Sequence, residues 1–419
     1  MRVYLFANAR PALPFIFDGG AERTTYSLVS GLAGKGFPVV QVCTFPRNNI
    51  DLAVANAMKM GASFTRKSGQ LDPALTVCTS KDHLLVRDGS LWIVAVDISE
   101  FRSVCSALLS NPYTKLVITW LKGSVDVIDI ARGFQVPTVL RIVGPYSFEG
   151  YPPVTSDTIM LANSPMTSHS ASRYYQRDVG FLLGVIDHAL YVAPVKTPRY
   201  ITYINPRTEK GIHLFCKIAA LLPDMPFLVV RGWSRDNFTG DELQALEFIR
   251  SLPNVKLMSP RSDMRDVYGL TRILVVPSRW QESWARVIGE AQANGIPVVA
   301  SNRGSSALNV GQGGVVLNYG QPDLWAAVIR RIYDDSELLS TLATNALLNI
   351  RRFDAATLVQ NYADYFSICA ERRQGELPQT IEDTVKMFYA ERDANGLPQI
   401  VPREVSMCIE SDIPEPAYS

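Results

Sequence analysis

The sequence predicts an α/β protein made of two units, each with a parallel sheet and helices between its strands. Short apolar runs of strand length alternate with stretches of helix length, an order typical of parallel strands joined by crossover helices. This order stops at a proline-interrupted segment, residues 193–199, and then begins again. A chain of 419 residues also exceeds what one hydrophobic core usually holds, which favours two domains.

The first unit begins with a short buried strand, Val3–Phe6, and a loop that carries Gly19 and Gly20. A helix is expected over residues 21–35, because apolar side chains recur on one face and Gly36 stops the pattern. Two glycines at a helix entrance let a ligand approach the backbone, but they also permit a plain tight turn. The other expected elements are strands over 39–45, 91–96, 116–120, 138–143 and 159–164, a helix over 125–133, and a hairpin turn at Asp88-Gly89 in an irregular stretch.

The second unit repeats this order from a strand at Tyr200–Ile204. Near its middle, the strand Ile273–Pro277 leads into a loop that ends at Trp284, and a helix over 285–293 stops at Gly295. The other expected elements are a helix over 212–222, a strand over 227–230 that leads to Gly232, a long amphipathic helix over 355–372 and a helical stretch over 381–392.

The composition describes a globular chain without a strong charge. Its net charge is +1, from 41 basic and 40 acidic residues, so no global field draws the protein to nucleic acid. No run of about eighteen apolar residues is present, and the first residues lack the pattern of a signal peptide. A cytoplasmic protein is expected, and peripheral contact with the inner face of a membrane is left open.

Neither a disulfide framework nor a metal site is indicated by the sequence. The six cysteines and four histidines are dispersed and form no Cys-x-x-Cys pair or Cys/His cluster. Most cysteines stand in apolar runs, which favours buried free thiols. No Asp-x-Asp element of a metal-dependent site appears. Chemistry without a metal ion or cofactor is therefore expected.

Glu282 and Glu290 are the most informative residues, because their positions predict a binding site. Glu282 lies in the loop after a strand, and Glu290 lies inside the helix that follows. In an open α/β sheet, ligands bind outside the carboxyl ends of the strands, and N–H groups at a helix start favour an anion. Carboxylates beside such an anion can accept hydrogen bonds from the vicinal hydroxyls of a sugar or ribose. The alternative for an isolated pair is a solvated loop glutamate and a helix-surface glutamate.

A second polar segment, Asn205–Gly211, also stands between a strand and a helix. A diphosphate could be bound there by Lys210 and backbone N–H groups, although charged loops at strand ends are common. Arg286 could add another cation to a donor site, or it could be an ordinary arginine on a helix surface. Both interpretations of Arg286 stay open at this point.

Several matched features occur in order along the second unit. They are the E-x7-E pair of Glu282 and Glu290, Val276-Pro277-Ser278, Glu290-Ala291, Gly295–Ser301, Asn302-Arg303-Gly304, Gly313-Gly314 and, further upstream, Lys210-Gly211. In these features the chain resembles retaining glycosyltransferases of the GT-B architecture, in particular glycosyltransferase family 4. The resemblance implies two Rossmann-like domains whose parallel sheets face each other across a cleft.

The resemblance also implies roles for individual residues. Glu290 would hold the ribose of a nucleotide-sugar, and Glu282 would bind the hydroxyls of the donor sugar. Lys210 and Arg207 would grip the diphosphate, although Arg207 stands nearer to the lysine than the family's arginine does. The remaining donor-binding positions are the N–H groups of Ser283 and Trp284, Gly232 in a turn near the nucleotide, and Gly19 and Gly20 facing the diphosphate.

The chain departs from the family at the end of the strand over 138–143. Many family members have a histidine there, which points toward the donor sugar, and this chain has Val143. Arg141 or Glu149 could supply the missing side chain. The expected domains are 1–193 on the acceptor side, 200–355 for the nucleotide-sugar, a helix over 356–376 that crosses back, and a C-terminal extension over 377–419.

The expected function is metal-independent transfer of a hexose from a nucleotide-sugar, with retention of anomeric configuration. Glu282 and Lys210 are the expected catalytic residues, and the acceptor is a sugar, a lipid-linked molecule or another small molecule. Two alternatives remain. One is a nucleotide-binding GT-B protein with a degraded site, and the other is a different GT-B enzyme, such as a sugar-nucleotide epimerase or a phosphorylase.

Overall fold

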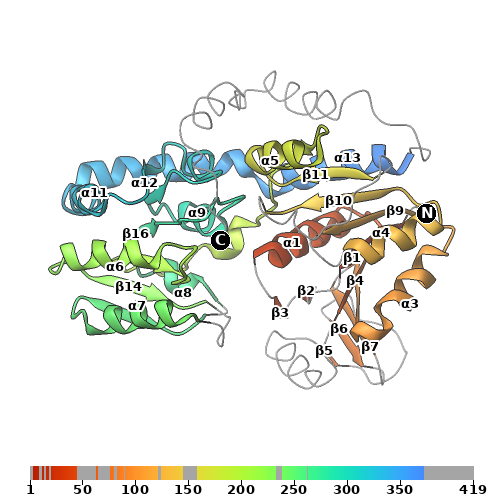
Figure 1. Cartoon of the computed structure of the whole chain (residues 1–419), viewed down its shortest axis with the longest axis horizontal. Helices are drawn as coiled ribbons and strands as arrows, with labels where there is room; N and C mark the ends of the chain where they lie inside the picture. Colours follow the sequence, from red (N-terminus) through yellow and green to blue (C-terminus); the bar gives the residue numbers. More distant parts are fainter. Residues whose placement is uncertain are drawn as a thin grey trace.

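The computed structural model shows an α/β fold with two Rossmann-like domains, as the sequence predicts (Figure 1). Each domain has its own sheet with helices on both faces. The structure describes residues 3–8, 12–13, 16–17, 20–44, 63–64, 76–79, 83–88, 90–120, 124–144, 158–232, 238–261 and 263–371. The expected helical stretch over 381–392 and the extension over 377–419 lie outside these residues.

The first domain is built on a ten-stranded sheet. Its strands are β1 (Val3–Asn8), β4 (Val39–Thr44), β5 (Ser63–Phe64), β6 (Thr76–Thr79), β7 (His83–Asp88), β8 (Leu91–Val96), β9 (Thr114–Trp120), β10 (Thr138–Ile142), β11 (Ile159–Ala162) and β12 (Gly180–Phe181). Their order is β12-β11-β10-β9-β1-β4-β8-β7-β6-β5. Strand β7 runs antiparallel to β6 and β8, and Asp88 pairs with Leu91, which confirms the predicted hairpin.

Helices cover both faces of this first sheet. They are α1 (Gly20–Gly34), α3 (Ile98–Leu109), α4 (Ser124–Gly133) and α5 (Pro165–Tyr175), and a small hairpin, β2 (Ala12–Leu13) with β3 (Ile16–Phe17), precedes α1. Leu28, Val29 and Leu32 recur at the spacing of one helical face, and all three are fully buried against the sheet. Helices α3 and α4 pack on the opposite face.

The second domain has a six-stranded sheet in which the described strands are all parallel. The strands are β13 (Tyr200–Ile204), β14 (Phe227–Val230), β15 (Val255–Met258), β16 (Thr271–Val276), β17 (Val298–Ser301) and β18 (Gly314–Leu317). Their order, β15-β14-β13-β16-β17-β18, places the first strand of the domain next to β16. The chain leaves β13 in one direction for β14 and β15, and it continues in the other direction from β16.

Helices also sandwich this second sheet. They are α6 (Ile212–Leu221), α7 (Gly240–Ser251), α8 (Arg265–Tyr268), α9 (Arg286–Gln292), α10 (Ser306–Val310), α11 (Pro322–Asp334) and α12 (Ser336–Ile350). Helices α6, α7 and α11 share one core with the sheet, and α8, α9 and α10 share the core on the other face. Helix α9 is slightly shorter than the helix expected over 285–293.

Helix α13 (Ala355–Glu371) follows the second domain in sequence but packs in the first, against α1 and β9 (Figure 1). The Tyr362 hydroxyl donates to the Leu182 carbonyl over 2.8 Å, and Lys35 Nζ donates to Gln360 Oε1 over 3.1 Å. A Cβ on Gly31 of α1 would lie 2.5 Å from Val359, so the two helices are in close contact. The end of the chain therefore completes the core of its beginning.

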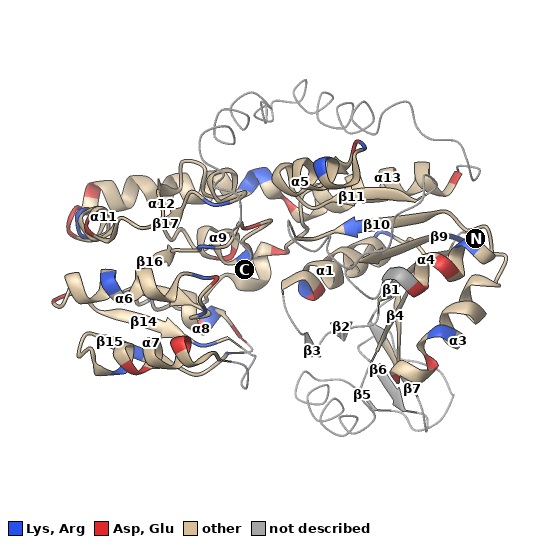
Figure 2. Ribbon diagram, viewed as in Figure 1, with Lys and Arg blue, Asp and Glu red and all other residues tan. Residues whose placement is uncertain are grey.

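Charges and thiols follow the expectations from composition where the structure describes them. Acidic and basic residues are interspersed along the helices of both domains (Figure 2). Cys43, Cys105, Cys216 and Cys369 are buried free thiols, and the side chains of Cys78 and Cys408 lie outside the described part. In that same part, no helix combines the length and apolarity that a bilayer crossing requires.

Candidate functional site

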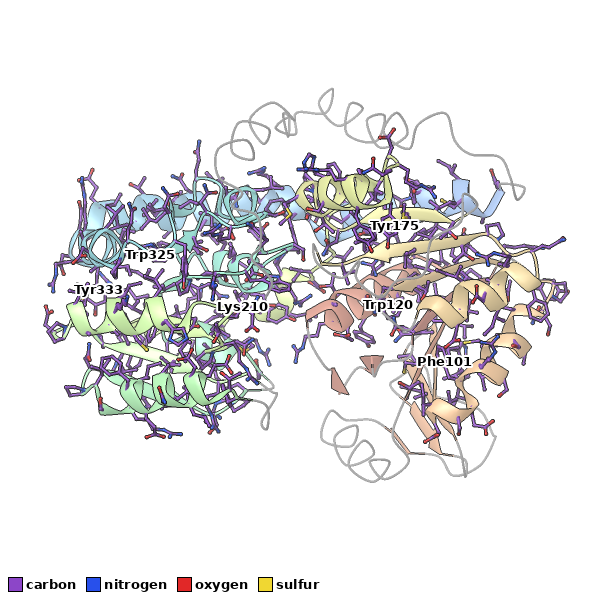
Figure 3. The ribbon with its side chains drawn as sticks, viewed as in Figure 1. Phe101, Trp120, Tyr175, Lys210, Trp325 and Tyr333 are labelled. Atoms are coloured by element: carbon purple, nitrogen blue, oxygen red, sulfur yellow. The ribbon has the colours of Figure 1, made fainter. Side chains whose placement is uncertain are left out.

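The candidate site lies at the carboxyl ends of β13 and β16, the two strands from which the second sheet grows in opposite directions. Such a switch point is where open α/β sheets bind ligands, because the loops diverge there. The loop after β13 carries Lys210, and the loop after β16 carries Glu282. The sheet therefore brings together two loops that are far apart in sequence. Lys210 lies on the side of its domain that faces the first domain (Figure 3).

Lys210 and Glu282 form a direct ion pair at this point. Lys210 Nζ lies 2.6 Å from Glu282 Oε1, which also accepts a hydrogen bond of 2.6 Å from the Ser278 hydroxyl. The carboxylate is nearly buried, whereas about a third of the lysine side chain, 34%, stays exposed. Within the described structure, Glu282 Oε2 makes no hydrogen bond. The pair thus offers a partly exposed cation and a free carboxylate oxygen side by side.

Two glycines allow the loops to approach this closely. Gly211 has a φ of +83°, and a Cβ there would fall 1.6 Å from the Pro277 carbonyl oxygen. Gly304 has a φ of +61° and touches the Glu282 backbone, where Ser305 N–H donates to the Glu282 carbonyl over 2.7 Å. Any side chain at either glycine would displace the backbone that holds Lys210 or Glu282.

Glu290 lies in different surroundings, inside α9 and nearly buried. Its Oε2 accepts a hydrogen bond of 2.6 Å from the Tyr268 hydroxyl, and its Oε1 lies 3.3 Å from Arg286 Nε. Burial, followed by the nearby charge of Glu290, raises the pKa of the Tyr268 hydroxyl well above its usual value. Tyr268 therefore remains a hydrogen-bond donor, and the carboxylate keeps a fixed orientation.

Arg286 also contacts the first domain, so it is not an ordinary surface arginine. Its Nη1 donates to Thr24 Oγ1 over 2.8 Å, and its Nη2 donates to the Tyr191 hydroxyl over 2.8 Å. A Cβ on Gly20 would lie 3.3 Å from Arg286 Cδ. The structure thus brings Gly20 and Arg286, candidates from opposite halves of the sequence, into contact. Gly19 lies outside the described residues.

Ser283 and Trp284 also face the first domain. The Ser283 hydroxyl donates to the Val143 carbonyl over 2.9 Å. Val143 stands at the position where many members of the resembled family have histidine. The Trp284 indole is buried, stacks edge-on against Phe353 with ring centroids 5.0 Å apart, and belongs to the core that contains α1 and α13. Both side chains make contacts between the domains, so only their backbone N–H groups remain as candidates for donor binding.

Arg207 is held within its own domain. Its guanidinium lies 3.1 Å from Glu242 and stacks over Phe238 at 3.8 Å. Glu242 also accepts from the Thr208 and Thr239 N–H groups. Burial favours the neutral acid, but these hydrogen bonds and the charge of Arg207 outweigh it and hold the pKa of Glu242 below its usual value.

The Arg207 contacts favour a structural role for this residue rather than the expected diphosphate contact. Gly232, the remaining candidate, lies against the side chain of Asn205, where a Cβ would come within 2.3 Å of Asn205 Oδ1. Gly232 therefore sits beside the first residue of the Lys210 loop. The backbone carbonyl of Arg207 accepts a hydrogen bond of 3.0 Å from the Lys210 N–H, so the turn that contains Arg207 also positions Lys210.

Three residues around Arg286 and Glu290 were not found by sequence reasoning: Thr24, Tyr191 and Tyr268. Each contributes one hydroxyl, and each hydroxyl contacts Arg286 or Glu290. Their sequence positions carry no motif, because the contacts arise from the packing of α1, α8 and the connection between the domains onto α9. The described residues contain no group of three His, Cys, Asp or Glu side chains that could hold a metal ion.

Residues 199–335 match the family model for glycosyl transferases group 1. This segment contains Lys210, Glu282 and Glu290, and it covers the sheet and the helices around the switch point. Over 118 residues, the chain is 30% identical to a D-inositol 3-phosphate glycosyltransferase of Corynebacterium kroppenstedtii, with 27% of this chain and 26% of the relative covered. It is 26% identical over 245 residues to the putative glycosyltransferase YtcC of Bacillus subtilis, with 55% and 54% covered.

Solved structures resemble the chain over a longer range. The Anabaena protein HepE, crystallised with UDP, superposes with a TM-score of 0.63 at 16% identity and covers 88% of this chain and 100% of its own. Sucrose-phosphate synthase from Thermosynechococcus elongatus also superposes with a TM-score of 0.63, at 14% identity, with 88% and 99% covered. These similarities confirm the GT-B fold. The matched part spans about a quarter to about half of the two curated relatives.

Proposed function

We propose that this protein is a glycosyltransferase that moves a sugar from a nucleotide-sugar donor to an acceptor. The observation that carries the proposal is the ion pair of Lys210 and Glu282, 2.6 Å apart at the switch point of the second sheet. A partly exposed cation suits a diphosphate, and a free carboxylate oxygen beside it suits the hydroxyls of the attached sugar. The match of this segment to the family model supports the same interpretation.

In this proposal the second domain binds the donor. Lys210 contacts the diphosphate, Glu282 Oε2 accepts from a hydroxyl of the donor sugar, and Glu290 accepts from the hydroxyls of the ribose. A carboxylate has about four lone-pair sites, so Glu290 retains acceptor capacity beside Tyr268 and Arg286. The Lys210–Glu282 pair opens when the diphosphate takes the ammonium group, and Glu282 Oε1 then keeps its hydrogen bond from the Ser278 hydroxyl.

The transfer step follows from these positions. The bond between the anomeric carbon and the diphosphate oxygen breaks, and the nucleoside diphosphate leaves with the electron pair. The fixed charge of Lys210 stabilises the negative charge that develops on it. The acceptor hydroxyl forms the new bond on the same face of the sugar, so configuration is retained, and its proton passes to the leaving phosphate. Lys210 supplies the positive charge in place of a metal ion.

Release of nucleoside diphosphate from UDP-, GDP-, ADP- and dTDP-sugars, measured in the presence of a chelator, tests the proposal. The parent protein is expected to hydrolyse or transfer from one donor slowly, and Lys210→Ala is expected to abolish the release. Glu209→Ala is the matched control, because Glu209 is an exposed neighbour in the same loop. Its activity should equal that of the parent.

The outcomes separate the alternatives. Formation of an isomeric sugar without transfer to an acceptor would replace the proposal with an epimerase. No release from any donor, with no nucleotide-induced thermal stabilisation, would replace it with a degraded site. The degraded-site alternative is motivated by Val143, which stands where the resembled family has histidine. In this chain the Val143 carbonyl accepts a hydrogen bond from Ser283 of the second domain.

A further inference from the structure

Arg286 is a nearly buried cation whose partners belong to three different parts of the molecule. Its Nε faces Glu290 on its own helix at 3.3 Å. Its Nη1 donates to Thr24 on α1 of the first domain, and its Nη2 donates to Tyr191, each over 2.8 Å. Tyr191 ends the short 3₁₀ helix His188–Tyr191, which leads into residues 193–199 and with them forms the connection between the domains. Only 9% of the Arg286 side chain is exposed. One guanidinium therefore contacts the donor domain, the first domain and their connection.

These contacts require a guanidinium rather than any cation. Its donors lie in one rigid plane and point outward in fixed directions, so three partners can be bound at once, whereas an ammonium group is a compact point charge. Thr24 is oriented to accept, because its hydroxyl donates to the Gly20 carbonyl over 2.8 Å. The hydrogen-bond directions along Gly20, Thr24 and Arg286 are therefore mutually consistent.

The orientation of Glu290 depends on this arrangement. Tyr268 holds one of its carboxylate oxygens, and Arg286 lies beside the other. If Arg286 lost its contacts with Thr24 and Tyr191, its planar group could turn, and the Glu290 carboxylate would lose a fixed neighbour. One guanidinium thus links Thr24 of the first domain to the Glu290 carboxylate of the second.

We propose that Arg286 is a positioning residue that couples nucleotide binding at Glu290 to the placement of α1 and of the connection between the domains. This inference rests on the proposed function, because it takes Glu290 as the ribose-binding carboxylate. Coupling of this kind is reciprocal. The nucleotide should therefore tighten the contacts of Arg286 with Thr24 and Tyr191, and those contacts should tighten nucleotide binding.

A double-mutant cycle tests the coupling. Binding of UDP, GDP, ADP and dTDP is measured by calorimetry for the parent, Thr24→Val, Arg286→Met and the double variant. Thr24→Val should lower the affinity for the tightest-binding nucleotide by roughly fivefold or more, although Thr24 lies in the other domain. In the Arg286→Met background, Thr24→Val should have no further effect. Thr138→Val is the control, because its buried hydroxyl donates to the Val136 carbonyl over 3.2 Å, away from Arg286.

Hydrogen exchange of the Tyr191 segment provides a second readout. Nucleotide should slow hydrogen exchange there in the parent but not in Tyr191→Phe, which lacks only the hydroxyl. Tyr191→Phe also replaces Arg286→Met as the test variant if Arg286→Met does not fold. Unchanged affinity in Thr24→Val, or an equal loss in both backgrounds, would overturn the coupling while the proposed function stands. A parent protein that binds none of the four nucleotides would overturn the proposed function, and the coupling with it.

Discussion

Two glutamates eight residues apart occupy surroundings that suit different tasks. Glu282 pairs with Lys210, and one of its oxygens has no hydrogen bond from any residue that the structure describes, so it can exchange partners when a ligand arrives. Glu290 is about equally buried but is held between Tyr268 and Arg286, so its geometry is set before a ligand arrives. The first arrangement suits a group that changes during a reaction, and the second suits recognition.

Substitution should separate these two tasks. Glu290→Ala removes charge-assisted hydrogen bonds to the ribose, each worth roughly 1.5 to 3 kcal/mol, so nucleoside diphosphate binding should weaken by about tenfold or more. Glu282→Ala should leave this binding nearly unchanged and reduce sugar transfer. Calorimetry and a transfer assay on the same preparations check both effects. Parent-like transfer in both variants would show that the residues do not form the site.

His188 gives the fold a measurable response to acid. Burial, and then the charge of Arg286, lower its pKa from 6.5 to about 4, with a smaller opposing effect of Asp354. The unfolded chain binds the proton below about pH 6.5, before the folded chain can do so. Stability should therefore be complete above pH 6.5 and fall as the pH decreases toward 4.

Urea unfolding at several pH values measures this loss of stability. His188→Gln should flatten the slope between pH 6.5 and 4, because the substituted side chain does not titrate. His169 is exposed and offers a matched control, His169→Gln. This variant should retain the slope of unfolding free energy against pH that the parent shows. An equal slope in the parent and His188→Gln would assign the acid response to other groups.

At the scale of elements, the strands were the most predictable part. The runs Leu91–Val96 and Phe227–Val230 match β8 and β14 at both ends, because a short apolar run between turn residues is compatible with little else. The family resemblance assigned Lys210 and Glu282 to one nucleotide-sugar site, and their direct ion pair was not predicted. The bond between Arg286 and Thr24 joins residues 262 positions apart. It depends on the placement of two domains, which no local pattern encodes.

The role of Arg207 is a prediction that can be tested at the scale of elements. Because it ties the loop after β13 to Glu242 at the start of α7, Arg207→Ala should lower the free energy of unfolding by roughly 1 to 3 kcal/mol. Nucleotide affinity should change less than about threefold, since the Arg207–Glu242 ion pair contributes little free energy to nucleotide binding. Thermal unfolding and calorimetry give the two numbers.

The control for Arg207 is Lys217→Ala, which removes an exposed cation from the same domain. It should leave both unfolding and affinity as in the parent. Loss of nucleotide binding in Arg207→Ala at unchanged stability would contradict this prediction. It would mean that the guanidinium leaves Glu242 and binds the diphosphate, as the family pattern predicts.

At the scale of the whole molecule, the proposed chemistry depends on fixed protein charges. Transfer should therefore continue in excess EDTA, because Lys210 provides the positive charge at the leaving diphosphate. The measurement is the initial rate with EDTA, with added Mg²⁺ and with added Mn²⁺. A rate that disappears with EDTA and returns with one of these ions would replace Lys210 by a metal ion as the main stabilising charge.

Helix α13 places a constraint on synthesis of the chain. The ribosome makes α13 after the whole second domain, yet Phe366 and Tyr362 of this helix are buried in the core of the first. The domain that emerges first is therefore finished last, and its apolar face stays open during translation of nearly the entire chain. Nascent chains stalled after residue 335 should be cleaved rapidly in the first domain by a protease, whereas chains in which residue 371 has left the exit tunnel should be protected.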